Sequence, residues 1–179
     1  KTKEYIFDGD IFQCVVSRRF EADYKNSLIN AYRVLRSTNP SPYMVYMSID
    51  GDEIISTSPE TLVKLQNGVL NTFPIAGSRP RGKTDTEDNA LADELIHDEK
   101  ELAEHNMLVD LGRNDIGKIS EFNSVKVTKY QELLRYSKIM HICSEVEGKL
   151  KDGLDAFDAI ESLLPAGTLS GAPKIRACE

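Results

Sequence analysis

The sequence predicts an α+β fold in which antiparallel sheets are flanked by helices. Short segments rich in β-branched and aromatic residues lie between residues 43 and 75, and two of their junctions are Asp50-Gly51 and Asn67-Gly68. These dipeptides favour tight antiparallel hairpins. Apolar residues at helical spacing follow as a block at about 86–112. Strands grouped before helices differ from the alternating order of a parallel α/β fold.

The elements of the first half follow from local pattern. A strand is expected at 10–20, and a helix at 26–37 that ends at the turn Asn39-Pro40-Ser41-Pro42, because proline disfavours helix in the residue before it. Four short strands are then expected to form an antiparallel meander, at residues 43–49, 53–57, 61–66 and 69–75.

The second half is expected to carry most of the helices. A loop rich in glycine and arginine is predicted at 76–83, before two helices at about 86–97 and 98–112. The remaining predictions are strands at 125–127 and 138–150, a helix at 156–163 and a loop at 167–173.

Composition limits the function classes. A chain of 179 residues is long enough for one substantial core, and a net charge of −7 without a basic cluster argues against nucleic-acid binding. No apolar run approaches the roughly 20 residues of a membrane span, and no signal peptide is recognisable. Three cysteines without metal-ligand spacing fit a reducing, cytoplasmic setting.

The predicted helix at 98–112 places acidic groups on one face. Glu101, Glu104, His105 and Leu108 recur at helical spacing. Two carboxylates one turn apart repel each other unless water, a cation or a basic group lies between them, and oxygen ligands suit Mg²⁺. The alternative is a solvated acidic face.

Other polar segments can be interpreted either as functional sites or as ordinary structural features. Arg79 and Arg81 follow a predicted strand and could bind a carboxylate or phosphate, or belong to a surface turn. The small-residue loop at 165–174 could offer backbone amides to an anion. His141 lies on a predicted strand, where a lone histidine is more often a hydrogen-bonded core residue than a catalyst. Glu60 alone would be an exposed loop carboxylate.

Taken together, these segments resemble the chorismate-utilising enzyme family. The matching segments occur in family order along nearly the whole chain: residues 9–13 (GDIFQ), 58–60 (SPE), 74–82 (PIAGSRPRG), the block 98–115, 140–141 (MH) and 166–174 (AGTLSGAPK). The resemblance implies part of the two-sheet chorismate-binding fold, with a deep substrate site between the sheets and Mg²⁺ as cofactor.

The resemblance also implies roles for single residues. Glu104 would be a Mg²⁺ ligand with Glu101 supporting it, and Thr168 with the amides of its loop, Gly167 included, would contact a substrate carboxylate. Glu60 would act as general acid for the departing ring C4 hydroxyl, which requires a raised pKa. His141 would lie beside the ring.

Two positions distinguish members of that family. Members that add water carry lysine where this chain has Gln13, a substrate-site amide that cannot act as base for water. Some ammonia-using members carry a nucleophilic lysine where Ala76 stands. Both residues imply conversion of chorismate and free ammonia to anthranilate and pyruvate, in tryptophan biosynthesis. The alternatives are a member that stops at aminodeoxychorismate, in folate synthesis, and a non-catalytic piece that binds tryptophan or a partner.

The resemblance further implies partners and regulation. A glutamine amidotransferase subunit would supply the ammonia. Asn39, Pro40, Tyr43 and Met44 resemble part of a feedback site for tryptophan, although the same residues also make a helix-stopping turn. Segments that the family carries before and after this region are absent, and the chain does not begin with methionine. We therefore expect residues 1–179 to be a partial catalytic domain, truncated at both ends, that is inactive alone.

Overall fold

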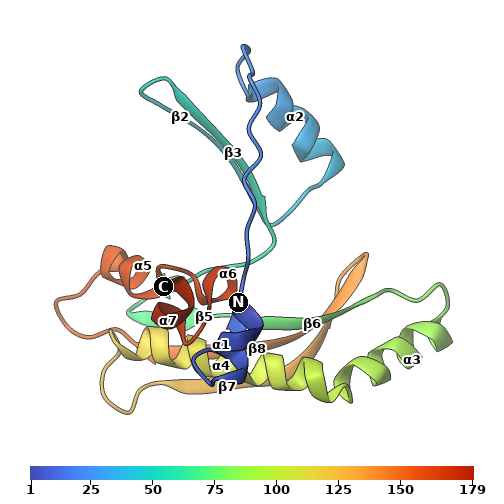
Figure 1. Ribbon diagram of the computed structural model, residues 1–179, viewed down its shortest axis with the longest axis vertical. Helices are drawn as coiled ribbons and strands as arrows, with labels where there is room; N and C mark the ends of the chain where they lie inside the picture. Colours follow the sequence, from blue (N-terminus) through green and yellow to red (C-terminus); the bar gives the residue numbers. More distant parts are fainter. The chain divides into compact units, whose positions relative to one another are not determined.

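The computed structural model describes residues 1–179 (Figure 1). The chain divides into two compact units, a larger one formed by Lys1–Val16 with Leu62–Glu179 and a smaller one formed by Ser17–Thr61. Every strand pair in the three sheets is antiparallel, and helices accompany the sheets, so the predicted α+β class is confirmed. None of the helices combines the length and apolar character that crossing a membrane requires.

The smaller unit is a hairpin with one helix. Its elements are α2 (Ile29–Thr38), β2 (Tyr43–Ile49) and β3 (Asp52–Ser58). Asp50 and Gly51 both have positive φ, as the tight turn between the strands requires. The Glu53 carboxylate on β3 accepts hydrogen bonds from the Tyr46 hydroxyl at 2.7 Å and from the backbone amide of Leu28, where α2 begins. One carboxylate therefore joins the hairpin to the helix, and these bonds lower the pKa of Glu53.

The larger unit is built on β8, which pairs along both of its edges. Residues Met140–Cys143 pair with β6 on one side and with β7 on the other, and β5 pairs with the C-terminal half of β8. The strands of this sheet are β4 (Lys64–Gln66), β5 (Val69–Thr72), β6 (Ile75–Pro80), β7 (Lys126–Arg135) and β8 (Ile139–Lys149). Its hairpin turn at Asn67 and Gly68 was predicted.

Several predicted boundaries were wrong, because pairing between distant segments overrides local pattern. The expected loop at 76–83 is mostly strand β6, whose pairing with β8 continues through a bulge at Gly77. The strand β7 has ten residues instead of the three expected at 125–127. The four predicted strands between 43 and 75 form two hairpins in separate sheets, not one meander.

The N-terminal and C-terminal segments also differ from expectation. Of the strand predicted at 10–20, only Gln13–Cys14 forms a strand, β1, and the helix α1 (Thr2–Phe7) was not predicted. The expected loop at 167–173 contains the short helix α6 (Gly167–Ser170) and β9 (Gly171–Ala172). The partner of β1 is β9, so the two ends of the larger unit meet in one ladder.

Two long helices pack against the sheet of the larger unit, as Figure 1 shows. They are α3 (Asp85–Ile96) and α4 (Glu99–Gly117), and the shorter helices α5 (Ala156–Leu163) and α7 (Lys174–Cys178) complete the unit. The buried side chains between these elements form the core: Ala92, Leu95, Met140 and Ile142 around α3; Val109, Ile116, Val146 and Leu163 around α4; and Leu70, Ile119 and Ala159 near α5.

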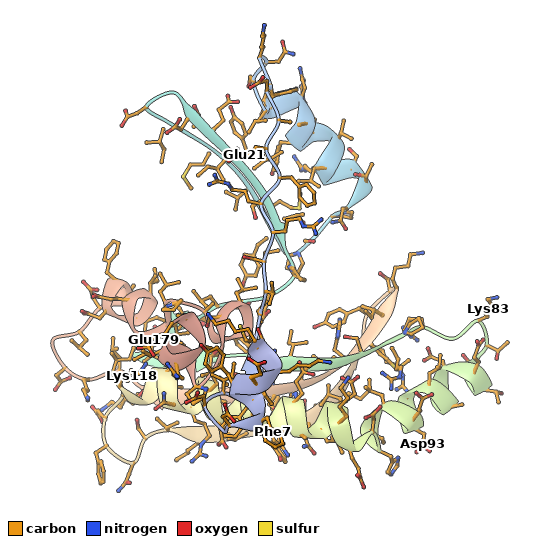
Figure 2. All side chains as sticks on the ribbon, in the orientation of Figure 1. Phe7, Glu21, Lys83, Asp93, Lys118 and Glu179 are labelled. Carbon is orange, nitrogen blue, oxygen red and sulfur yellow. The ribbon has the colours of Figure 1, made fainter.

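A buried ion pair fastens the C-terminal segment to the end of α4. The Lys174 ammonium lies 2.6 Å from Asp115 Oδ2 and donates to the Leu163 carbonyl at 2.8 Å. Lys118, labelled in Figure 2, approaches Asp115 Oδ1 at 3.2 Å from the solvent side. Because α7 follows β9 directly, this anchor also fixes the β1–β9 ladder relative to α4.

Replacing Lys174 by methionine leaves the Asp115 side chain, only 6% exposed, with Lys118 alone. We expect the free energy of unfolding to fall by about 3–5 kcal/mol, which is typical of a buried ion pair that loses one partner. Urea denaturation measures the loss. Lys118→Met is the matched control, because that side chain is 49% exposed and its removal should cost less than about 1 kcal/mol. Equal losses would contradict the anchoring role of Lys174.

Asp88 on α3 gives the larger unit a dependence on acid pH. Its carboxylate accepts two hydrogen bonds from Arg81, at 2.7 and 2.9 Å, and one from the Gly82 amide at 2.8 Å. These bonds, those from Arg81 foremost, lower the pKa of Asp88 from 3.8 to about 2. Because the pKa of the folded state lies below that of the unfolded state, this stabilisation is complete above about pH 4 and lost as the pH falls towards 2.

We therefore expect the difference in free energy of unfolding between the wild type and Asp88→Asn to shrink as the pH falls from about 4 to about 2. Denaturant titrations at several pH values measure this difference. A difference that stays constant over that range would show that the Asp88 charge contributes nothing.

Candidate functional site

A cavity of about 800 Å³ lies along the face of α4 that points away from the sheet. The helix, β1 and β9 contribute its walls, which are mostly apolar with a few polar groups. The lining residues are Phe12, Gln13, Lys100, Ala103, Glu104, Met107, Asp110, Leu111, Ala172 and Pro173. The cavity therefore brings together two residues that the sequence marked for the site, Gln13 and Glu104.

The sequence of α4 explains which face lines the cavity. Asp98 caps the helix, since its carboxylate accepts hydrogen bonds from the amides of Lys100 at 3.0 Å and Glu101 at 3.2 Å. His105, Leu108, Val109 and Ile116 recur at helical spacing and are buried on the sheet side. Glu104 lies one position away from His105, and the 100° turn per residue points it to the cavity instead.

The Glu104 carboxylate has no hydrogen-bonding or ion-pair partner within the chain. The other acidic residue of the cavity, Asp110, accepts a hydrogen bond from Arg113 at 2.9 Å. Lys100, one turn earlier, also lines the cavity but forms no ion pair with Glu104, so this carboxylate beside Met107 and Leu111 is suited to an added cation or a hydrogen-bond donor.

Glu101 lies at the edge of the sheet and is already engaged by a cation. The guanidinium of Arg79 on β6 lies 3.6 Å from Glu101, 2.9 Å from Asp98 and 3.0 Å from Glu94. Arg81 likewise pairs with Asp88. The two arginines thus bind carboxylates that belong to the chain itself, on or next to α3 and α4.

The ladder between β1 and β9 holds Gln13 at the cavity. Gln13 is in register with Ala172, the Phe12 amide donates to the Ala172 carbonyl at 2.8 Å, and the Val15 amide donates to the Ser170 carbonyl at 2.9 Å. Both Gln13 and Ala172 line the cavity. Residues far apart in the sequence therefore form one wall.

Gly167 and Thr168 lie in α6, which packs on α4. A side-chain Cβ at Gly167 would lie 1.9 Å from Leu111 Cδ2, so only glycine allows this approach. Thr168 is half-buried. Neither residue lines the cavity, but Gly167 contacts the Leu111 side chain that does.

His141 lies on the face of β8 opposite the one that carries the buried residues Met140 and Ile142. Its Nδ1 lies 2.7 Å from Ser78 Oγ, and its ring meets that of Tyr136 edge to face with centroids 5.9 Å apart. His141 is not among the residues that line the cavity.

The remaining marked residues belong to the smaller unit. Glu60 follows β3, and burial raises the pKa of its carboxyl group. The Asn39 carbonyl accepts a hydrogen bond from Thr57 Oγ1 at 3.3 Å, and Tyr43 and Thr61 share a hydrogen bond between their hydroxyl groups. Met44 pairs with Thr57 across the hairpin, and Pro40 lies in the turn after α2.

A buried polar contact beside Glu104 was not predicted. His105 is completely buried, and its Nε2 lies 2.6 Å from Ser144 Oγ on β8. The sequence did carry a signal for this contact, because both polar residues stand at positions where the pattern predicts a buried apolar residue. His105 precedes Leu108 on the buried face of its helix, and Ser144 lies between Ile142 and Val146 on its strand. No cluster of three or more His, Cys, Asp or Glu side chains placed to hold a metal ion occurs in the chain.

Comparison with known proteins adds a family context. A family model described as chorismate binding enzyme matches residues 1–179. The anthranilate synthase component 1 of Acetivibrio thermocellus is 54% identical over 179 residues, which are all of this chain and 36% of that protein. The chain thus spans little more than a third of the length of this relative.

Solved structures agree with the sequence comparison. The crystal structure of anthranilate synthase component I from Streptococcus pneumoniae TIGR4 matches 99% of this chain and 39% of that chain, with a TM-score of 0.86 and 51% identity. A menaquinone-specific isochorismate synthase from Escherichia coli shares the fold at a TM-score of 0.64 over 75% of this chain and 31% of its own, at 23% identity.

Replacing Gly167 by alanine tests the packing of α6 on α4. A new methyl group would lie 1.9 Å from one Leu111 methyl carbon and 2.8 Å from Leu111 Cγ, so the Leu111 side chain or one of the two helices must move. We expect a loss of about 1–3 kcal/mol in the free energy of unfolding, measured in urea. The control Gly117→Ala has open space around it and should gain up to about 1 kcal/mol. A neutral Gly167→Ala would contradict the close approach.

Proposed function

The chain belongs to the chorismate-binding enzyme family, and we propose that it supplies the substrate site of an anthranilate synthase component I. The proposed reaction of the whole protein converts chorismate and ammonia to anthranilate and pyruvate, in the cytoplasm, for tryptophan biosynthesis. The observation that carries the proposal is the cavity in which Gln13 and Glu104 meet. It offers apolar walls for a ring and a carboxylate for a cation, as small-molecule sites commonly do.

The residues of the cavity fit Mg²⁺. This ion commonly takes one or two protein carboxylates and leaves its other positions to water and substrate, and the Glu104 carboxylate is without a partner in an accessible cavity. Glu104 would hold the ion. Glu101, one turn earlier and held by Arg79, would support it. When bound, Mg²⁺ would neutralise the ring carboxylate of chorismate, which favours departure of the C4 hydroxyl.

Gln13 and Ala76 support ammonia as the proposed nucleophile. The Gln13 amide reaches the cavity but cannot deprotonate water, which disfavours hydroxylation of the ring. Ala76 is buried and has no nucleophilic atom, so no covalent amine intermediate can form there. Free ammonia is then the reactant that remains, and it would add at C2 of the ring.

The proton for the departing hydroxyl would come from Glu60. A carboxylic acid donates a proton near neutral pH only if its pKa is raised, and burial raises that of Glu60. His141, its Nδ1 hydrogen-bonded to Ser78, would lie beside the ring. Thr168 and the backbone amide of Gly167 would contact a carboxylate of the substrate.

Two partners belong to the proposal. A glutamine amidotransferase subunit would supply ammonia, as the second component of such an enzyme. Tryptophan would bind as feedback inhibitor at the turn after α2 and the start of β2, with Asn39, Pro40, Tyr43 and Met44 as contacts. The support for both is the resemblance of the chain to its relatives.

A chimera tests the proposed reaction. The 179 residues of this chain replace the matching segment in the full-length Acetivibrio thermocellus relative, and the unmodified relative serves as control. Given chorismate, ammonium and Mg²⁺, the chimera should release anthranilate and pyruvate, identified by mass spectrometry. Accumulation of aminodeoxychorismate would contradict the assignment of Gln13 and Ala76.

In the same chimera, Glu104→Gln should lower the Mg²⁺-dependent rate by roughly 100-fold or more, the scale of a single electrostatic contribution to catalysis. Its circular dichroism should match that of the parent, because Glu104 has no hydrogen bond or ion pair to lose. Glu99→Gln in the same helix is the control, since Glu99 is exposed and does not line the cavity. Parental turnover in Glu104→Gln would overturn the metal assignment.

A further inference from the structure

The buried contact between His105 and Ser144, next to Glu104, leaves one polar atom without a hydrogen bond. His105 Nε2 lies 2.6 Å from Ser144 Oγ, and Ser144 Oγ also accepts a hydrogen bond from the Gln131 amide at 3.0 Å. His105 Nδ1 is buried and has no hydrogen-bond partner. The side chain as a whole is 0% exposed.

Neither tautomer of His105 satisfies every group. If the Ser144 hydroxyl donates to Nε2, then Nδ1 carries a proton with no acceptor. If Nε2 donates to Ser144, the serine hydroxyl proton has no acceptor and Nδ1 has no donor. A buried polar group without a partner costs folding free energy, and an apolar pair would avoid that cost. Stability alone therefore does not explain a histidine at this position.

The contact belongs to a larger connection between α4 and a bulge in β7. The pairing of β7 with β8 shifts register between Lys129 and Glu132, and Gln131 within this bulge has a φ of +54°. The bulge directs the Gln131 amide to Ser144. It also places the Tyr130 hydroxyl and the Gln131 side-chain amide 2.6 and 2.9 Å from Asn106 Oδ1.

These contacts hold the two residues that follow Glu104 in the helix. His105 is fixed to the sheet through Ser144, and Asn106 is fixed to the bulge. Because successive residues of a helix point 100° apart, fixing two neighbours fixes the direction of the third. The bulge of β7 therefore helps to fix the direction of the Glu104 Cα–Cβ bond, together with the apolar packing of Leu108, Val109 and Ile116.

We propose that His105, through Ser144 and the bulge at Gln131, is a positioning residue that keeps the Glu104 side chain projecting into the cavity, where its carboxylate can bind a divalent cation. The inference rests on the proposed function, because Glu104 is its metal ligand. Side chains that orient a metal ligand without touching the metal are common in metal sites, where they set affinity more than stability.

The test measures Mn²⁺ binding in the chimera without turnover, from the electron paramagnetic resonance signal of free Mn²⁺. His105→Leu should raise the Mn²⁺ dissociation constant about tenfold or more while the protein stays at least as stable in urea. His105→Gln, which keeps a hydrogen-bonding group near Ser144, should stay within about threefold of the parent. The Mg²⁺ concentration for half-maximal activity should follow the same order.

Two further variants keep the test decisive if His105→Leu folds poorly. Asn106→Ala removes both bonds to the bulge from an exposed position and should weaken Mn²⁺ binding about threefold or more. Ser120→Ala is the control, because Ser120 is as buried as His105 but bonds only the Ile116 carbonyl, within α4 and its end. Its Mn²⁺ affinity should not change.

The outcomes separate the two proposals. If the unmodified chimera binds Mn²⁺ and needs Mg²⁺, but His105→Leu and Asn106→Ala match it, the positioning role alone is overturned. If the unmodified chimera neither binds Mn²⁺ nor needs Mg²⁺, the metal assignment of the proposed function fails, and the positioning role fails with it. Weakened binding in His105→Leu with rescue by His105→Gln supports both.

Discussion

The candidate site depends on one constraint, the rotation of α4 about its own axis, because that rotation decides which side chains face the cavity. One face of this helix must bury Leu108, Val109 and Ile116 against the sheet, and the opposite face then lines the cavity. His105 and Asn106 add polar contacts with fixed geometry to that apolar packing. Apolar contacts alone tolerate small rotations, whereas hydrogen bonds are directional. The polar contacts therefore restrict the direction in which the Glu104 side chain leaves the helix.

Charge is distributed around this helix so that most acidic groups are neutralised within the chain. Arg79 engages three carboxylates at the N-terminal end, and Lys174 engages Asp115 in the interior near the other end. Glu104, between them, has no partner. The Arg79 contacts hold β6 against α4, and the Lys174 contact holds the segment that carries the β1–β9 wall of the cavity. The same interactions thus serve both the fold and the site.

Local signals in the sequence predicted the elements that depend on local structure. The turns at Asp50-Gly51 and Asn67-Gly68 and the helix at 156–163 are all present, because turn chemistry and helical periodicity involve neighbouring residues. The strand β6 was missed because glycine and proline resemble loop residues, and pairing with β8 overrides that preference. Gln13 could be named only from a family resemblance, whereas Glu104 was also indicated by the spacing of acidic residues along its helix. Their meeting in one cavity depends on the β1–β9 ladder, which no local pattern indicates.

A crystal structure of the chimera soaked with Mn²⁺, with anomalous scattering recorded at the manganese edge, tests the central claim most directly. We predict an anomalous peak in the cavity along α4, at about 2.0–2.3 Å from a Glu104 carboxylate oxygen, the range of oxygen ligands to such cations. His105 should keep its contact with Ser144 in the same crystal. A manganese peak outside this cavity, or a Glu104 side chain turned away from a metal ion within it, would contradict the role of Glu104 as a metal ligand.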